Sequence, residues 1–410
     1  MQAYERLIRY ARIHTTSCEN ADTTPSTTRQ FDLAHVLEKE MHSIGFIDVG
    51  VDEHAYVYGI IPSSAECRNW PSIGLIAHLD TAPDFSGEGV NPQIVSDYDG
   101  KDILLGSRVL SPEQFPDLKK LIGHTLITTD GNTLLGADDK AGIAEILTAC
   151  EEIVIENLPH GRIAVCFAPD EEIGHGASLL SLERLGAEFA YTVDGGAPNE
   201  INYETFHAAE AVLDFQGVNV HPGEAKGIMH NASLLAMEFD SLLPLSERPE
   251  STEGYQGFFH LTQMYGDVEK AQLRYIIRDH DAGHFEARKQ MMAECAHNQN
   301  KKYGEGSVSL QIRDQYHNMA EILADHPGII RRAEKAIRMA GLQPRCSPIR
   351  GGTDGAQLSF RGLPCPNLGT GGAAFHGPYE HISVQNMELC VRILKNILLQ
   401  APGKGETDAR

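Results

Sequence analysis

Several short apolar segments of this chain end directly in acidic or histidine residues, and this recurrence limits the folds that the chain can adopt. The segments cover residues 72–77, 162–168 and 189–193, and they lead into His78 and Asp80, into Glu171 and Glu172, and into Asp194. Segments with helical spacing separate them, so the alternation predicts an α/β domain with a mainly parallel sheet. Because the carboxyl ends of parallel strands meet at one edge of a sheet, we expect these polar side chains to share a site.

The stretch LLGADDKAG, residues 134–142, places two adjacent carboxylates, Asp138 and Asp139, before a predicted helix. The apolar residues that follow recur with helical spacing, at Ile143, Ile146, Leu147, Cys150 and Val154. Acids before a helix commonly do no more than favour its N-terminus, by capping and through the helix dipole. The acids and histidines at the other strand ends favour a second interpretation, a shared metal site.

His78 and Asp80 follow the apolar segment 72–77. A single histidine in a strand is commonly a buried core residue. Here the two residues are two positions apart, so both side chains are expected on the same face of the strand. That spacing allows the carboxylate to orient an imidazole that binds a metal.

The middle of the chain has a different order of elements, which predicts an inserted domain. Its expected elements are strands at 212–220, 258–265, 272–278 and 308–313 and helices at 232–243 and 285–296. The order β-α-β-β-α-β is typical of a ferredoxin-like unit. We therefore predict a first domain at 1–207 that resumes at 318–400, an inserted domain at 208–317 and a flexible tail at 401–410.

Local patterns add three further predictions. Ser26 is expected to cap a helix that ends at Gly45. Residues 82–124, rich in Pro, Gly and Asp, are expected to form a long irregular insertion. Residues 126–129 and 133–135 flank an Asp-Gly pair, which is typical of a β-hairpin.

Charge and cysteine usage restrict the possible partners and the compartment. The net charge of −23 argues against nucleic acid and anionic membranes as partners, since both require basic patches. The eight cysteines lack paired spacing, which is typical of a reduced, cytoplasmic protein. The N-terminal segment has charges throughout and no apolar core of a signal peptide. The glycine-rich stretches 351–355 and 369–372 lack nucleotide-loop spacing, so we interpret them as tight turns.

Long motifs of this sequence resemble the peptidase T family, which comprises tripeptide aminopeptidases of a di-zinc superfamily that also includes aminoacylases and succinyl-diaminopimelate desuccinylase. The resemblance runs from the first predicted helix nearly to the C-terminus. It rests on AHLDTAPD (77–84), LLGADDKAGIAEI (134–146), PDEEIG (169–174), YTVDGG (191–196), NVHPGEAKGIMHNA (219–232), YIIRD (275–279), IRGGTDGAQLSF (349–360) and HGPYE (376–380).

The resemblance implies a catalytic domain that binds two zinc ions and an inserted lid domain. It implies that His78 and Asp194 bind one ion, that Glu172 and His376 bind the other, and that Asp138 bridges them. It also implies that Asp80 orients His78 and that Glu171 is the general base. His381 also lies beside Glu380, but the superfamily pattern His-x-x-x-Glu selects His376 as the ligand.

Three further residues carry roles implied by the resemblance. His221, on the inserted domain, would stabilise the oxyanion; the sequence alone favours a turn residue before Pro222 instead. Arg278 and Arg350 would bind the C-terminal carboxylate of the substrate, the alternative being structural pairing. The family likeness also predicts a cis peptide bond between Asp138 and Asp139, and a homodimer.

The expected activity is therefore zinc-dependent removal of the N-terminal residue from tripeptides. One alternative is a related di-zinc amidohydrolase acting on dipeptides or N-acyl amino acids. Another is a metal-binding interaction module without activity, against which the adjacent pair Glu171 and Glu172 argues. Histidine and carboxylate ligands also suit manganese or cobalt, so the ligand types leave the native metal open.

Overall fold

The structure is a computed structural model that describes residues 1–403 of the chain. It divides into two compact units. Unit 1 comprises Met1–Tyr203, Met319–Ser347 and the chain from Thr353 onward, and unit 2 comprises Glu204–Asn318 and Pro348–Gly352. The tail predicted at 401–410 lies largely outside the described residues. None of the helices in residues 1–403 is long and apolar enough to cross a membrane.

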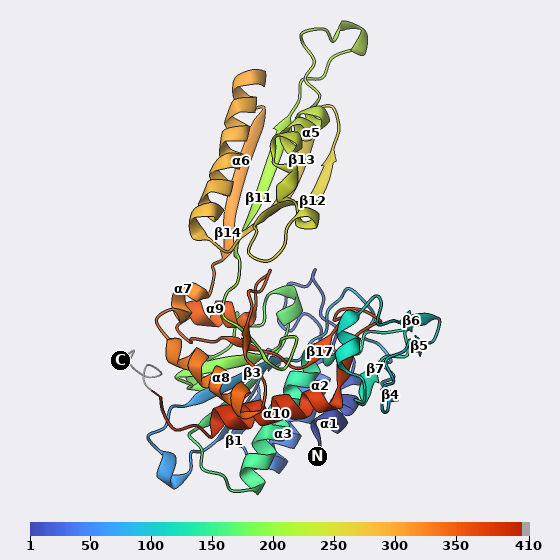
Figure 1. Cartoon of the computed structure of the whole chain (residues 1–410). Helices are drawn as coiled ribbons and strands as arrows, with labels where there is room; N and C mark the ends of the chain where they lie inside the picture. Colours follow the sequence, from blue (N-terminus) through green and yellow to red (C-terminus); the bar gives the residue numbers. More distant parts are fainter. Residues whose placement is uncertain (404–410) are drawn as a thin grey trace. The chain divides into compact units, whose positions relative to one another are not determined.

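Unit 1 is built on an eight-stranded mixed sheet with helices around it (Figure 1). In spatial order the strands are β1 (Ile47–Val51), β2 (Val57–Ile61), β8 (Ile163–Ala168), β3 (Ile73–His78), β9 (Phe189–Val193), β16 (Asn367–Leu368), β10 (Glu200–Asn202) and β15 (Arg345–Cys346). The central strands β8, β3, β9 and β16 run parallel, as expected. Antiparallel pairs at β1–β2, β2–β8 and β10–β16 make the whole sheet mixed.

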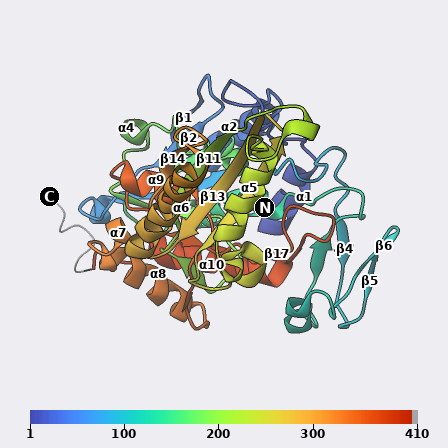
Figure 2. The same cartoon turned by 90° about the horizontal axis from the view of Figure 1, so that it is seen from above.

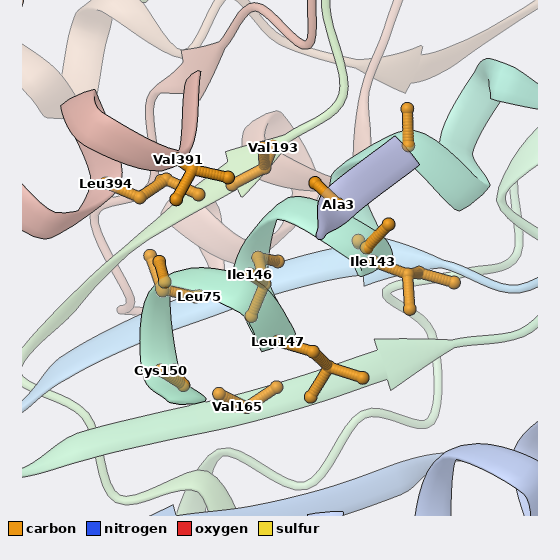
Figure 3. Close-up of a cluster of buried hydrophobic side chains, with 14 of the residues drawn as sticks. Ala3, Leu75, Ile143, Ile146, Leu147, Cys150, Val165, Val193, Val391 and Leu394 are labelled. Atoms are coloured by element: carbon orange, nitrogen blue, oxygen red, sulfur yellow. The ribbon is translucent and has the colours of Figure 1, made fainter. Parts of the chain in front are cut away.

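The core of unit 1 forms where the long helix α3 packs on the sheet. The helices of this unit are α1 (Ala3–Ala11), α2 (Gln30–Ile44), α3 (Ala137–Ile155), α4 (Leu182–Leu185), α7 (Ala320–Leu323), α8 (Pro327–Met339), α9 (Asp354–Phe360) and α10 (Val384–Leu398). Figure 3 shows the predicted apolar stripe of α3 lying among Leu75 and Val165 of the sheet and Val391 of α10. The stripe is buried from Ile143 to Cys150, but its last member, Val154, is exposed.

The segment 82–124 is more ordered than we expected. It contains β4 (Gln93–Val95), β5 (Ile103–Leu105) and β6 (Arg108–Leu110). Strands β5 and β6 form a two-stranded sheet, whereas β4 joins a second sheet in the order β17-β18-β7-β4. The other strands of that sheet are β7 (Leu126–Thr128), β17 (Gly372–Ala373) and β18 (His381–Ser383). Apolar side chains of 98–126 form a small separate core, which includes Leu126 of β7.

The predicted hairpin at 126–135 is wrong. Strand β7 pairs with β18 and β4, and residues 133–135 are not a strand. The backbone N–H of Leu134 donates to the carbonyl of Ser86, and that of Leu135 donates to the side chain of Glu380. Partners distant in sequence therefore replace the local pairing that the Asp-Gly turn favoured.

Unit 2 has the predicted ferredoxin-like order. Its elements are β11 (His207–Gln216), α5 (Ala232–Leu242), β12 (Phe258–Gly266), β13 (Lys270–Asp279), α6 (Ala282–Tyr303) and β14 (Val308–Tyr316). The sheet order is β12-β13-β11-β14, and every neighbouring pair is antiparallel. Helices α5 and α6 lie side by side across the sheet (Figure 2), and their apolar side chains form a core of their own.

Two further local predictions need correction. Strand β11 covers 207–216 rather than 212–220, because Gly217 and Val218 leave the sheet to bond with Glu269 and His230. Ser26 does not cap α2, which begins at Gln30; its backbone N–H and hydroxyl instead donate to Asp170. Gly45, with φ of 108°, ends the helix as predicted.

Candidate metal centre

Residues from five separate parts of unit 1 meet at the carboxyl edge of its central strands. His78 ends β3, and Asp194 follows β9 directly. Asp138 and Asp139 lie at the start of α3, while Glu171 and Glu172 lie in a short 3₁₀ turn after β8. His376 comes from the loop between β17 and β18. The structure thus brings together every residue that the resemblance implied as a metal ligand.

Asp138 lies between two imidazoles. Its Oδ1 is 3.0 Å from Nε2 of His78, and its Oδ2 is 3.2 Å from Nε2 of His376. The same nitrogen of His376 is 3.1 Å from Oε2 of Glu172. Nε2 of His78 is 3.7 Å from Oδ1 of Asp194. Two groups of ligand atoms therefore share one carboxylate, with one oxygen of Asp138 in each group.

The clustered carboxylates stabilise positive charge on the two imidazoles between them. Burial alone would lower the pKa of His78, but Asp194, Asp138 and Asp80 raise it well above its ordinary value. Hydrogen bonds to Asp138 and Glu172 raise the pKa of His376 to about 11. Burial, with Asp138 nearby, raises the pKa of Asp194 to about 7. The carboxylates thus favour cations at these positions, and metal ions compete with protons for the same ligand atoms.

The donor atoms fit divalent metal ions. Ligand atoms of His78, Asp138 and Glu172 lie within 4.8 Å of one another, as do those of His78, Asp139 and Asp194. Within residues 1–403, Oε1 of Glu172 and Oδ1 of Asp139 are buried without a hydrogen-bond partner. Imidazole and carboxylate ligands suit zinc, manganese and cobalt.

Asp139 is a member of this group that sequence analysis did not assign. It is fully buried, and its Oδ2 accepts a hydrogen bond of 3.1 Å from the backbone N–H of His78. The first residues of α3 explain its position. The Asp138–Asp139 peptide bond is cis, as predicted, and both residues have non-helical backbone angles. Gly142 permits the close packing of this turn, since a Cβ there would lie 2.0 Å from the carbonyl oxygen of Val193.

Asp80 contacts His78, as expected, and also the turn of Glu171 and Glu172. The Nδ1 of His78 is 3.0 Å from the backbone carbonyl of Asp80 and 3.4 Å from its carboxylate. The two carboxylate oxygens of Asp80 accept hydrogen bonds from the backbone N–H groups of Glu171 (3.0 Å) and Glu172 (3.2 Å). Asp80 therefore positions the turn that bears the two glutamates as well as contacting the imidazole.

Glu171 lies beside the proposed ligands in a strongly acidic environment. Burial, followed by the nearby Asp194 and Asp354, raises the pKa of its carboxyl well above its ordinary value. The residue before it, Asp170, has φ of 57° and is held by Ser26 and Gln30. A raised pKa suits a group that must take up a proton and release it again.

Glu380 is a second residue that sequence analysis left without a role. Its carboxylate accepts backbone hydrogen bonds from Leu135, Gly136 and Asp138, at 2.7, 2.8 and 3.0 Å. The only sequence signal was its place in the pattern His-x-x-x-Glu after His376. His381, next to it, has different partners, since its Nε2 lies 3.3 Å from Asp117.

His221 lies in unit 2, in an exposed turn. Its Nδ1 accepts a hydrogen bond of 3.1 Å from the backbone N–H of Gly223. This bond assigns the proton of the neutral ring to Nε2, which can then donate. His221 can therefore be a turn residue, as the sequence favoured, and still donate a hydrogen bond from Nε2.

Arg278 and Arg350 both contact backbone groups of unit 2. The guanidinium of Arg278 is 3.1 Å from the carbonyl of Ile277 and lies over the ring of Tyr316. Arg350 donates from Nη1 to the carbonyls of Gly254 (2.8 Å) and Gln256 (2.9 Å). These contacts match the structural alternative, and a role in binding substrate stays a prediction for both residues.

Comparison with known proteins identifies similar chains. Residues 127–400 match the peptidase family M20/M25/M40. Peptidase T from Bacillus licheniformis is 51% identical over 398 residues, which cover 96% of this chain and 97% of that protein. The crystal structure of an aminopeptidase, PepT, from Bacillus cereus has a TM-score of 0.77 at 22% identity and covers 97% of both chains. A dinuclear metal binding peptidase of the M20 family from Bacillus subtilis has a TM-score of 0.64 at 13% identity, covering 97% of this chain and 98% of its own.

Proposed function

Because this chain belongs to the peptidase family M20/M25/M40 and has peptidase T among its close relatives, we propose that it is a tripeptide aminopeptidase that works with two bound zinc ions. The observation that carries the proposal is the position of Asp138, whose two carboxylate oxygens face His78 and His376 separately. A carboxylate with this arrangement can bridge two metal ions.

The proposed ligands fall into two sets that share Asp138. His78 and Asp194 would hold one ion, and Glu172 and His376 would hold the other. Asp139 lies close to the first set but already accepts a hydrogen bond from the backbone of His78. When bound, the metal pair supplies Lewis-acid polarisation of the peptide carbonyl and lowers the pKa of water at the site.

The protein side chains would carry out the proton transfers. Glu171 takes a proton from the attacking water and passes it to the leaving amine, for which its raised pKa is suited. The N–H at Nε2 of His221 stabilises the negative charge that develops on the carbonyl oxygen. Asp80 keeps Glu171 and Glu172 in place through their backbone N–H groups. Arg278 or Arg350 would bind the C-terminal carboxylate of the peptide.

The proposal extends to the organisation of the protein. Unit 2, predicted from the sequence as an inserted domain at 208–317, would act as a lid that supplies His221 to a catalytic domain made of 1–207 and 318–400. We propose a homodimer in the cytoplasm, with the cysteines reduced and small peptides as substrates. Sedimentation analysis of the purified protein would test the dimer.

The activity is tested with a panel of tripeptides, dipeptides, N-acetylated tripeptides and N-acyl amino acids, with the products identified by mass spectrometry. We expect release of the N-terminal residue from free tripeptides and no turnover of the N-acetylated ones. Metal analysis of the same preparation should find two ions per chain. Efficient hydrolysis of N-acyl amino acids together with rejection of free tripeptides would instead support an amidohydrolase.

A further inference from the structure

Glu380 connects the loop that bears His376 to the turn that bears Asp138. It lies four residues after His376, and only 1% of its surface is exposed. Its Oε2 accepts hydrogen bonds from the backbone N–H groups of Leu135 (2.7 Å) and Gly136 (2.8 Å), and its Oε1 accepts one from Asp138 (3.0 Å). Three charge-assisted hydrogen bonds at one buried carboxylate are a strong, directional restraint.

These three N–H groups belong to the turn that carries the bridging carboxylate. Residues 135–138 lead into α3, where Gly136 has φ of 76° and Asp138 departs from helical angles. N–H groups at the start of a helix have no partner within the helix and favour a negative charge. Glu380 supplies that charge from a segment about 240 residues further along the chain.

The segment that supplies it is the one that carries His376. Residues 374–380 form the loop between β17 and β18, and both Ala374 and His376 have positive φ. The side chain of His376 is 43% exposed, whereas that of His78, at the end of a central strand, is 2% exposed. Among the proposed ligands, His376 therefore depends most on the restraint of its loop.

We propose that Glu380 is a positioning residue that sets the spacing between His376 and Asp138. It would thereby set the affinity for the second metal ion, which is the ion that Glu172 and His376 would hold. This inference rests on the proposed function, because it requires a metal pair. The first ion, which His78 and Asp194 would hold, should depend less on Glu380, since both of those ligands extend from strands of the central sheet. The two ions should therefore respond differently when Glu380 is altered.

The test is the variant Glu380→Gln, measured for its binding of zinc ions. The substitution preserves size but turns one acceptor oxygen into an NH₂ group that faces a backbone N–H. We expect a folded protein that binds the first ion within about threefold of the wild type. The second ion should bind about 10–100-fold more weakly, the usual effect of altering a group that supports a metal ligand. Competition with a chromophoric chelator gives both dissociation constants without use of activity.

Two comparisons separate positioning from a general loss of stability. Glu145→Gln is the matched control: Glu145 is a fully buried carboxyl on α3 whose partner is the thiol of Cys390 on α10. It should bind both ions as the wild type does. His376→Ala should lose the same second ion as Glu380→Gln, and the double variant should weaken that ion no further than His376→Ala alone. Glu380→Asp, whose carboxylate is withdrawn by one methylene, serves if the glutamine variant fails to fold.

The outcomes are distinguishable. Selective weakening of one ion in Glu380→Gln, shared with His376→Ala, would support the inference. The inference would be overturned if Glu380→Gln bound each ion as tightly as the wild type does. It would also be overturned if the variant bound both ions more weakly by the same factor. A wild-type protein that binds fewer than two ions would overturn the proposed function, and the inference with it.

Discussion

The two units of the molecule differ in whether acidic side chains cluster within them. In unit 1, Asp138, Glu171, Glu172 and Asp194 crowd around two imidazoles at one edge of a sheet. In unit 2, acidic side chains are instead paired with basic ones. Examples are Arg248 with Asp240 (2.8 Å), Lys302 with Glu238 (2.8 Å) and Arg288 with Glu247 (2.9 Å).

This difference shows that unit 1 contains an arrangement of charges that folding alone does not require. Both units have an apolar core of their own, so both have an ordinary source of stability. Clustering buried carboxylates costs free energy unless a cation compensates them. Unit 2 contains no such cluster among the described residues. We therefore attribute metal binding to unit 1 and expect its stability, rather than that of unit 2, to depend on metal.

The largest expected effect comes from Glu171→Gln. The substitution preserves size but removes the base, so kcat should fall by about 10²–10⁴-fold while two metal ions per chain are retained. Steady-state kinetics and metal analysis on the same preparation check this. An active Glu171→Gln enzyme with two ions would show that another group is the base.

The matched variant is Glu172→Gln at the adjacent position. It removes an anionic ligand, so it should lose metal first, and excess zinc should restore part of the activity. The two substitutions change neighbouring residues in the same turn, which controls for local disruption. If Glu171→Gln sheds metal while Glu172→Gln keeps both ions and is inactive, the two roles are exchanged.

A smaller effect is expected from His221→Ala, which tests whether unit 2 takes part in the chemistry. Loss of one oxyanion donor should lower kcat by about 10²–10³-fold, with metal content and folding unchanged. The effect on kcat should exceed that on KM if the contact forms only in the transition state. His230→Ala, at a histidine in the same unit to which the proposal gives no catalytic role, is the control. An unchanged kcat in His221→Ala would leave His221 as a turn residue only.

Removal of metal should lower the unfolding free energy of unit 1 but not that of unit 2. At free zinc concentrations of about 100–1,000 times Kd, each bound ion adds about 2.7–4.1 kcal/mol to the unfolding free energy. Trp70, the only tryptophan, lies in unit 1 and reports its unfolding by fluorescence. A chelator should lower that transition but leave hydrogen exchange in β11 and β13 of unit 2 unchanged. Equal destabilisation of both units would contradict the comparison.

The smallest expected effect is a pH dependence within unit 2. His280 is 8% exposed, donates from Nδ1 to the carbonyl of Thr205 and packs against Phe206. Burial lowers its pKa below the ordinary value of 6.5. The unfolded chain therefore takes up a proton more readily, and unit 2 should lose stability as the pH falls below about 6.5.

Hydrogen exchange of unit 2 at pH 8 and pH 5 measures this loss. His280→Asn, which keeps a donor near the position of Nδ1, should reduce the difference between the two pH values. His284→Asn, at an exposed imidazole of the same unit, should leave it unchanged. A pH difference of the same size in all three proteins would assign the effect to other groups.

Local patterns predicted the elements that hold the site but not all of the contacts within it. The apolar segments before Glu171 and Asp194 became β8 and β9, with bounds within one residue of those expected. Their composition was sufficient because a buried strand requires only a short apolar run. By contrast, Ser26 and Leu135 found partners at Asp170 and Glu380, respectively 144 and 245 residues away in the chain. Neither pairing leaves a periodic signal.

The sequence was sufficient to predict the alternation of strands and helices and the inserted β-α-β-β-α-β unit, because hydrophobic periodicity is a local property of the chain. It also determined which residue types end the central strands. Three contacts follow from the packing of the elements instead: Asp139 lies among the proposed ligands, Asp80 holds the turn of Glu171, and Glu380 ties the loop of His376 to α3. Each of these contacts joins a side chain to a backbone N–H on a different element. Such a contact depends on how the elements pack, which no local pattern encodes.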